Sequence, residues 1–392
     1  MTPPQSPAET PPGGALRRAA PALLGYAAVR ALGLVTLAVW SAVNGRSAHR
    51  LLSGRWDSLW YTRVADLGYG YEVRLPNGDV HSNLAFFPLL PWLERTVHAV
   101  SPLSYADAGL LVSAVASLAA AWGIFAVADH VHGGRVGVWA ALVWAVLPVG
   151  IVQSMAYSES LFTALAAWSL YAVLTGRWLT AGLLAAFAGL TRPVGVAVVA
   201  ALWVAAVTAF VGEHRHGGST PRTDGARPWR RALAMIIAPL GAAGYVLWVG
   251  HRTGRGPFGY LDVQAGWRNG FDGGYAFGRF VAEKFTSFPS ALAGAALILG
   301  VVLVLLLYVT GVRQGQPPAL LVYTGIVVAL ALCASSYFGS KPRLLLPAFP
   351  LLFPLARALA RSRPSRSALV IGLVAVASAV YGAFWLNGSG PP

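Results

Sequence analysis

The sequence predicts an all-α polytopic membrane protein, a bundle of about eleven transmembrane helices. Of its 392 residues, 56% are hydrophobic and only 11% are charged, roughly half the charged fraction of a soluble domain. The mean hydropathy of +0.60 is too high for a water-soluble core to hide all the apolar residues. The 14 tryptophans and 14 tyrosines are typical of a protein with many bilayer interfaces.

The net charge of +15 does not indicate a nucleic-acid partner, because the charges lie in short connectors and form no basic face with interleaved aromatic residues. Only Lys284 and Lys341 are lysines, and the abundance of Arg, Ala, Gly and Val favours a bacterial source, hence a plasma-membrane location. The single cysteine, Cys333, lies in an apolar run, which excludes a disulfide framework and a cysteine-based metal site.

The transmembrane domain is predicted to cover residues 21–386, between a disordered cytoplasmic tail at 1–20 and a short tail at 387–392. Apolar runs that fit about 30 Å of hydrocarbon lie at 21–43, 105–128, 136–151, 159–174, 178–190, 194–211, 232–250, 290–310, 318–334, 344–360 and 367–386. The runs at 178–190 and 194–211 are predicted to be either two short helices or one broken helix.

The distribution of basic residues favours a cytoplasmic N-terminus, because the connectors on that side hold fourteen basic residues against four acidic ones over a short length. Two exterior loops follow, at 44–104 and 251–289, and both are longer than a simple connector needs. Helical spacing of apolar residues at 51–61, and the proline-interrupted run at 86–93, predict amphipathic helices lying on the membrane surface in the first loop.

Asp57 is the first catalytic candidate, because a carboxylate partly removed from water at the interface is a better general base near neutral pH. The alternative is a solvated helix charge paired with Arg55 or Arg63.

Five motifs carry a family resemblance: RWDSLWY at 55–61, NLAFFPLLP at 83–91, GLTRPVG at 189–195, QAGW at 264–267 and KPRLLLPAFP at 341–350. Their order and their placement between spans closely resemble the PIG-V-like mannosyltransferases of the GT-C superfamily, from about residue 20 to 385. The resemblance implies transfer of a sugar, mannose in this family, from a polyprenyl-phosphate donor to a lipid or glycan acceptor at the exterior face. It also implies that Asp57 is the general base, with inversion at the anomeric carbon.

A lipid donor carries its own leaving group, which fits the absence of a Gly-rich nucleotide-binding turn. The leaving phosphate needs cationic donors. Arg192, flanked by apolar runs, is the main candidate, with a snorkelling interfacial arginine as the alternative. Lys341 and Arg343 stand together at an exterior helix start and are predicted to bind phosphate as a pair, or else to contact lipid headgroups.

Six further residues are candidates for contact with the sugar or the acceptor: Trp56, His81, Asn83, Glu159, Gln264 and Trp267. For Glu159 the alternative is a favourable charge at a helix N-terminus, and for Trp267 an interface anchor. Glu72, Asp79 and His81 lack the spacing of a preorganised metal site, so no metal and no cofactor are predicted.

Three alternatives remain open on the sequence. A transporter or flippase also has many spans and buried charges, but it often shows an internal repeat, which we do not find. A non-catalytic subunit would lack the early acid, whereas Asp57 is present. A GT-C enzyme that transfers another sugar, or that glycosylates protein, is not distinguished by the sequence.

Overall fold

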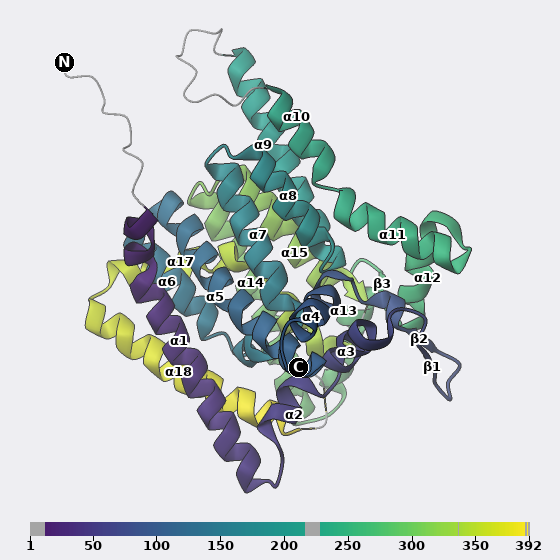
Figure 1. Cartoon of the computed structure of the whole chain (residues 1–392). Coiled ribbons are helices and arrows are strands. Elements are labelled where there is room, and N and C mark those ends of the chain that lie inside the picture. Colours follow the sequence, from purple (N-terminus) through teal and green to yellow (C-terminus); the bar gives the residue numbers. More distant parts are fainter. Residues whose placement is uncertain (1–11, 216–227, 336, 389, 391–392) are drawn as a thin grey trace, which may run out of the picture.

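The computed structural model describes residues 12–215, 228–335, 337–388 and 390, and most of them are helical (Figure 1). Six helical segments in these ranges are long and apolar enough to cross a membrane, which makes the chain a multi-pass integral membrane protein. They are α1 (Pro12–Val43), α5 (Tyr105–His132), η3 with α9 (Pro193–Gly195, Val196–Arg215), α10 with α11 (Pro228–Ile237, Leu240–Thr253), α14 (Ser290–Arg313) and α18 (Pro364–Leu386).

The other five predicted runs also hold helices. Four are shorter: α6 (Gly134–Ala145), α7 (Ser158–Leu174), α8 (Trp178–Gly189) and α15 (Pro318–Cys333). The fifth is a pair bent by 78°, made of η6 and α16 (Phe338–Ser340, Lys341–Leu344) and η7 and α17 (Phe349–Leu352, Phe353–Arg361). By length and composition the described residues hold six spans, or seven with the bent pair, so the number eleven stays a prediction.

The centre of the bundle is formed by α5, α6, α7, α8, α9, α15 and α17, whose buried surfaces are rich in alanine. Small residues allow helices to approach closely in a membrane. A Cβ added to Gly241 of α11 would lie 1.8 Å from the carbonyl oxygen of Ala186 in α8, so a side chain there would push the two helices apart. Helices α1 and α18 pack side by side along one flank (Figure 1).

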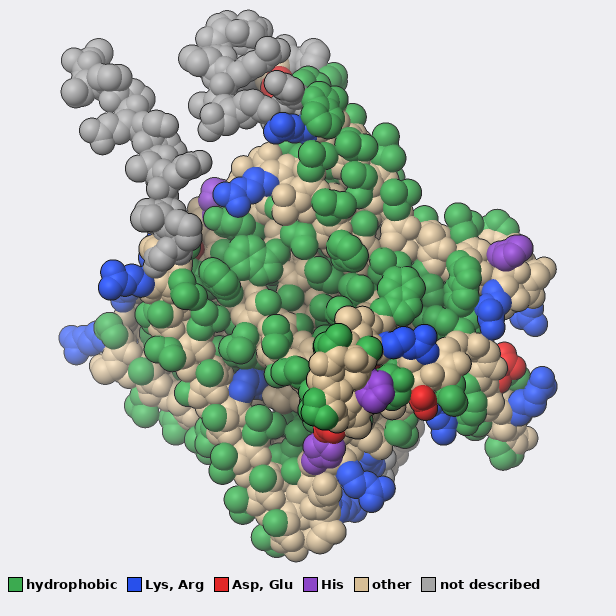
Figure 2. Space-filling view, in the orientation of Figure 1, with side chains coloured by type: hydrophobic (Ala, Val, Ile, Leu, Met, Phe, Trp, Pro, Cys, Tyr) green, Lys and Arg blue, Asp and Glu red, His purple; other side chains and the backbone are tan. Residues whose placement is uncertain are grey.

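The visible face of the bundle is covered mainly by hydrophobic side chains, as Figure 2 shows. Charged and histidine side chains on this face gather mostly at its ends and over the loop elements. This is the distribution expected of a protein whose middle lies in hydrocarbon.

The first predicted exterior loop folds into six short elements at one end of the bundle (Figure 1). They are α2 (Ala48–Ser53), α3 (Asp57–Leu67), the antiparallel strands β1 (Glu72–Arg74) and β2 (Val80–Ser82), η1 (Asn83–Ala85) and α4 (Leu89–Ala99). Val73 pairs with His81 in the hairpin. A single-turn helix, η2 (Gly150–Ser154), precedes α7.

The second predicted exterior loop contains η4 (Gly256–Phe258), α12 (Gly259–Gly266), β3 (Gly270–Phe271), α13 (Tyr275–Glu283) and η5 (Lys284–Thr286). Strand β3 pairs with β4 (Ala334–Ser335), and α12 packs on β2 and η1. The two loops are therefore in contact, and Trp267 donates to the carbonyl of Ser82, 185 residues earlier in the sequence.

The structure corrects three local predictions. A single surface helix over 51–61 is wrong, because a left-handed φ of 51° at Trp56 separates α2 from α3. Helix α4 begins at Leu89 rather than within 86–88, directly after Pro88, and proline is best tolerated at the start of a helix. Helix α1 begins at Pro12, so the predicted tail at 1–20 is too long, and residues 1–11 lie outside the described residues.

The alternatives left open at 178–211 resolve into two helices, α8 and α9. The chain between them is extended at Arg192, with φ −158° and ψ 151°, before Pro193 begins η3. An extended residue before proline is the usual conformation.

Candidate active site

Asp57 is the first residue of α3 and directly follows the turn at Trp56, whose φ of 51° and ψ of −125° are unusual for a residue with a side chain. Such a conformation costs on the order of 1–3 kcal/mol and persists only where other contacts hold it. The Arg55 guanidinium lies 4.0 Å from the centre of the Trp56 ring. The Arg55 backbone N–H donates to Ser58 Oγ at 3.1 Å. These contacts fix the turn that sets the direction of Asp57.

The Asp57 carboxylate pairs with Arg343 of α16, with 2.8 Å between Oδ2 and Nη2. The alternative pairings with neighbours on its own segment are not formed. Arg55 donates to the C-terminal carbonyls of α18, and Arg63 lies over the ring of Tyr71. The acid in the first predicted exterior loop is thus tied to α16, almost 300 residues later in the chain.

Glu159 lies in the first turn of α7, and its side chain is only 2% exposed. Its Oε1 lies 2.6 Å from Arg192 Nη1 and 3.4 Å from Arg343 Nε. One carboxylate therefore holds both guanidinium groups, in addition to its favourable position at a helix N-terminus. A buried carboxylate requires such partners, because an unpaired charge away from water is very costly.

Arg192 is joined to α3 through two hydroxyl groups. Its Nη1 donates to Ser158 Oγ at 3.1 Å, and Ser158 Oγ lies 2.7 Å from the Tyr61 hydroxyl. Burial raises the pKa of Tyr61 above its usual range, so this phenol stays protonated at neutral pH. With its side chain 14% exposed and paired to Glu159, Arg192 does not snorkel into open water.

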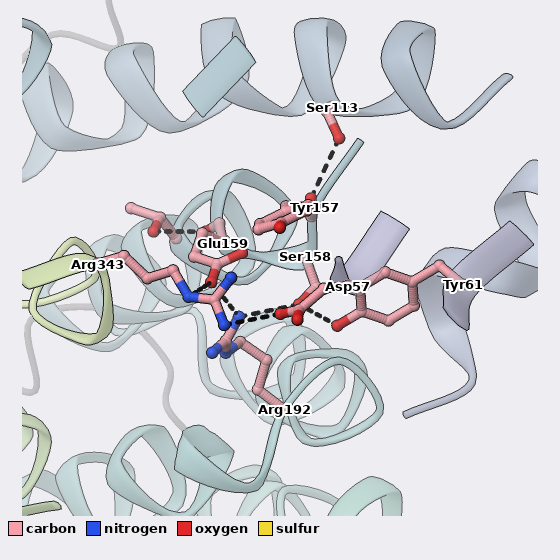
Figure 3. A network of polar contacts seen from close by, with 9 residues as sticks. Asp57, Tyr61, Ser113, Tyr157, Ser158, Glu159, Arg192 and Arg343 are labelled. Carbon is pink, nitrogen blue, oxygen red and sulfur yellow. Dashed lines mark hydrogen bonds and ion pairs between the residues drawn. The ribbon is translucent and has the colours of Figure 1, made fainter. Parts of the chain in front are cut away.

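Asp57, Glu159, Arg192 and Arg343 form a group of two carboxylates and two guanidiniums, which we call the charge quartet (Figure 3). Its members come from α3, α7, the α8–η3 connection and α16. Asp57, at 24% exposure, is the most accessible side chain of the four. A substrate would therefore reach this carboxylate first.

An aromatic cluster adjoins the quartet. Trp60, one turn after Asp57, stacks on Phe86 at 5.6 Å and meets the edge of Trp267 at 4.9 Å between ring centroids. Phe86 in turn packs edge-on against Tyr61 at 5.2 Å. The cluster connects the second loop to α3, so Trp267 is linked to the quartet through aromatic rings.

The remaining predicted sugar-contact residues have partners within the chain. Asn83 is buried, accepts from the Gly70 N–H and donates to the Gly68 carbonyl, both at 3.0 Å. Gln264 Oε1 accepts from the Asn269 side chain at 2.9 Å. The side-chain amides of Asn83 and Gln264 hold the conformation of the loops. Few of their hydrogen-bond donors and acceptors therefore remain for a sugar.

His81 stacks on Trp267 with 4.0 Å between ring centroids, and burial lowers the pKa of its imidazole. Trp267 Nε1 donates to the Ser82 carbonyl at 3.0 Å. Trp56 carries the Arg55 guanidinium on its ring. The rings of Trp56, His81 and Trp267 lie around the quartet. Each already makes a stacking contact or a hydrogen bond within the protein, which leaves only part of its surface for a ligand.

Lys341 does not join Arg343, contrary to the prediction of a phosphate-binding pair. Its Nζ donates to the carbonyls of Ala331 and Ala334, both at 2.8 Å, and the residue is 4% exposed. Residues two apart on a helix face different directions, so Arg343 turns to the quartet while Lys341 caps the end of α15.

The described residues contain no group of three or more His, Cys, Asp or Glu side chains arranged to hold a metal ion. Of the residues weighed for such a site, Asp79 pairs with Arg268 at 2.6 Å and His81 stacks on Trp267. Glu72 lies exposed on β1.

Sequence reasoning missed Tyr61, Ser158, Trp60 and Phe86 as neighbours of the quartet. Trp60 and Tyr61 stand in the same motif as Asp57, three and four residues later respectively, which is the spacing of one helix face. That spacing was a usable signal. No sequence signal placed Ser158 beside Tyr61, because their contact joins two distant helices.

Residues 27–213 match the family model for mannosyltransferase (PIG-V), a range that includes Asp57, Glu159 and Arg192. The predicted family resemblance is confirmed. Arg343, the fourth member of the quartet, lies outside the matched range. No curated protein matches the sequence.

Two solved structures are similar to the chain. ArnT from Cupriavidus metallidurans bound to undecaprenyl phosphate matches with a TM-score of 0.50 at 16% identity, over 87% of this chain and 62% of that one. The Archaeoglobus fulgidus oligosaccharyltransferase matches with a TM-score of 0.47 at 15% identity, over 93% of this chain and 53% of that one. The chain therefore has a helical fold similar to that of ArnT, and it spans less than two thirds of the length of either structure.

Proposed function

We propose that the chain is a membrane glycosyltransferase. It moves a sugar, mannose according to its family resemblance, from a polyprenyl-phosphate donor to a hydroxyl of a lipid or glycan acceptor. The observation that carries the proposal is the charge quartet, because it holds one accessible carboxylate against two buried guanidiniums. A general base and cationic donors for a phosphate are the groups that this transfer needs.

In the proposed reaction Asp57 takes the proton of the acceptor hydroxyl while that oxygen attacks the anomeric carbon. The bond from this carbon to the phosphate oxygen breaks, the configuration inverts, and polyprenyl phosphate leaves with the electron pair. Arg343 and Arg192 stabilise the negative charge that develops on the departing phosphate. The undecaprenyl phosphate in the ArnT structure supports a lipid-linked donor for this fold.

The proposed location is a bacterial plasma membrane with a cytoplasmic N-terminus and an exterior active site. The support is the density of basic residues in the connectors assigned to the cytoplasm. This orientation assigns Asp57 to the first exterior loop, and it assigns Glu159, Arg192 and Arg343 to the exterior ends of apolar segments.

The test compares wild type with Asp57→Asn in membranes supplied with radiolabelled polyprenyl-phosphate mannose, following lipid and protein products. We expect transfer by wild type and a loss of about 10²- to 10⁴-fold in the variant, the usual contribution of a positioned base. Asp79→Asn removes an equal charge from the Arg268 ion pair and serves as the matched control. Equal transfer by Asp57→Asn would remove Asp57 as the base.

A failure of wild type to transfer any of several donor sugars to any acceptor would favour a transporter or a non-catalytic subunit. Label that appears on protein rather than lipid would identify a protein-glycosylating enzyme. For Arg192→Ala we expect sharply reduced donor use with normal membrane insertion, because Glu159 keeps its second partner in Arg343.

A further inference from the structure

Arg343 is a buried guanidinium whose hydrogen-bonding capacity is not fully used. The residue is 8% exposed. Nη2 pairs with Asp57 at 2.8 Å, while Nε lies 3.4 Å from Glu159 Oε1. Within the described ranges, neither Nε nor Nη1 has a hydrogen-bond acceptor. Buried donors without acceptors are costly, and an anion that binds with two oxygens along the Nη1–Nη2 edge satisfies Nη1 only by taking Nη2 from Asp57.

The two carboxylates and two guanidiniums of the quartet neutralise one another, but several of their polar atoms have no hydrogen-bond partner among the described residues. Both Glu159 oxygens are buried and Oε1 forms ion pairs with both arginines, yet neither oxygen meets the geometry of a hydrogen bond to any described residue. An arginine can bind two oxygens of a carboxylate or a phosphate along one edge. In this structure Nη2 of Arg343 is paired with Asp57, the group proposed to act as base.

We propose that Arg343 is shared in turn by Asp57 and the donor phosphate. Without donor the guanidinium holds the Asp57 carboxylate, and a phosphate bound to Arg343 displaces that carboxylate and frees it to accept a proton. This inference rests on the proposed function, and it adds an order of events in which the base is released only when a donor is in place.

The groups around Asp57 allow this exchange. Arg192 stays paired with Glu159 at 2.6 Å and is held by Ser158 at 3.1 Å, so it does not compete for Asp57. The Arg343 guanidinium lies 5.0 Å from the centre of the Tyr157 ring, which supports its plane whichever anion it binds. Only the partner of Nη2 has to change.

The exchange makes Asp57 and phosphate competitors for one cation. Removing the carboxylate must therefore strengthen phosphate binding, although it removes the base. A residue that only supported the local structure would weaken binding when it was replaced. A base with no link to Arg343 would leave binding unchanged.

The experiment measures co-purification of radiolabelled undecaprenyl phosphate with the full chain in nanodiscs. We expect Asp57→Asn and Asp57→Ala to bind about tenfold more tightly than wild type, the scale of one charge-assisted hydrogen bond. Asp79→Asn, with the same charge change, should bind as wild type does. Arg343→Gln should lose most of the binding, and a thermal unfolding scan of each variant checks that it is folded.

Inorganic phosphate and phosphatidic acid serve as competitors, and they separate a polyprenyl phosphate from other phosphate sources. Equal or weaker binding by both Asp57 variants, with wild type still binding, would overturn the exchange while leaving the proposed donor intact. Absence of binding by wild type and all variants would overturn the proposed donor, and the exchange with it.

Discussion

Glu94 of α4 carries a fully buried carboxyl group outside the charge quartet. Neither of its oxygens has a hydrogen-bond partner among the described residues. A Cβ added to Gly109 of α5 would lie 2.6 Å from Glu94 Oε1, so the glycine provides the room for this side chain. Burial raises the pKa of Glu94 well above its usual range. The folded chain therefore holds the Glu94 proton more tightly than the unfolded chain does.

We predict that Glu94→Gln stabilises the protein at neutral pH and has little effect near pH 4. The pKa of Glu94 is higher in the folded chain than in the unfolded chain, where it is about 4.5. The contribution of Glu94 to the free energy of unfolding is therefore complete below pH 4.5 and is lost as the pH rises toward the pKa of the folded state. Glutamine has no ionised form, so the variant escapes this loss. We expect its melting temperature in detergent at pH 8 to exceed that of wild type by a few degrees.

The check is a series of melting temperatures for both proteins from pH 4 to pH 9. The other carboxyl groups titrate in both proteins and cancel in the difference. A difference that stays constant with pH, or that shrinks as the pH rises, would contradict a buried proton on Glu94.

At the scale of elements, the C-terminal end of α18 is joined to the first loop. The Arg55 Nη1 donates to the Leu386 carbonyl at 3.1 Å, and the Arg46 guanidinium donates to the Asn387 carbonyl. Free carbonyls at a helix C-terminus attract cations. Since Arg55 also stacks on Trp56, the end of α18 supports the turn that directs Asp57.

We predict that Arg55→Ala lowers the turnover number about tenfold and changes the KM for the donor little. Loss of the guanidinium releases Trp56 from its left-handed conformation and displaces the base, and small displacements of a catalytic group are costly. Steady-state kinetics in membranes measure the effect. The control is Arg63→Ala, which removes an exposed arginine of α3 that lies over the ring of Tyr71.

Arg55→Lys should restore part of the turnover, because an ammonium group also donates to the α18 carbonyls. If Arg55→Ala and Arg63→Ala lowered turnover equally, the support from α18 would have no special part in placing Asp57.

At the scale of the whole molecule, the bundle brings four distant segments to one end. The first loop, the start of α7, the α8–η3 connection and α16 all meet there (Figures 1 and 3). No single segment contains enough of the quartet to bind a phosphate and a hydroxyl together. The site exists only when the helices are packed.

We predict that this end faces the exterior. In a Cys333→Ala background, Asn77→Cys at the hairpin tip should react with an impermeant thiol reagent in intact cells. Arg135→Cys, at the start of α6, should react only after the membrane is opened. The opposite pattern would place the quartet on the cytoplasmic side and contradict the proposed exterior reaction.

Most of the helical architecture followed from the sequence, since each of the eleven predicted runs contains a helix. Backbone N–H and C=O groups in the hydrocarbon of a membrane must form hydrogen bonds within their own segment. A long apolar run therefore predicts a helix. The break at Trp56 was not predictable in the same way. Its left-handed conformation depends on contacts with Arg55, Ser58 and the end of α18 rather than on local apolar spacing.

The residues of the candidate site were likewise predictable from the sequence, whereas the contacts between them were not. Asp57 was selected as a carboxylate partly removed from water at the membrane interface. Glu159, Arg192 and Arg343 were selected because each stands at the end of an apolar run, where a charge is expensive and usually has a function. Lys341 met the same criterion, yet it caps the end of α15.

The sequence by itself determined that the chain enters the membrane as helices and which charged residues need a partner there. Both properties follow from the cost of removing single residues from water. Only the tertiary structure decided that Asp57 pairs with Arg343, and that one glutamate holds two arginines. Pairing depends on distances of a few ångströms between segments far apart in the chain, and packing alone fixes those distances.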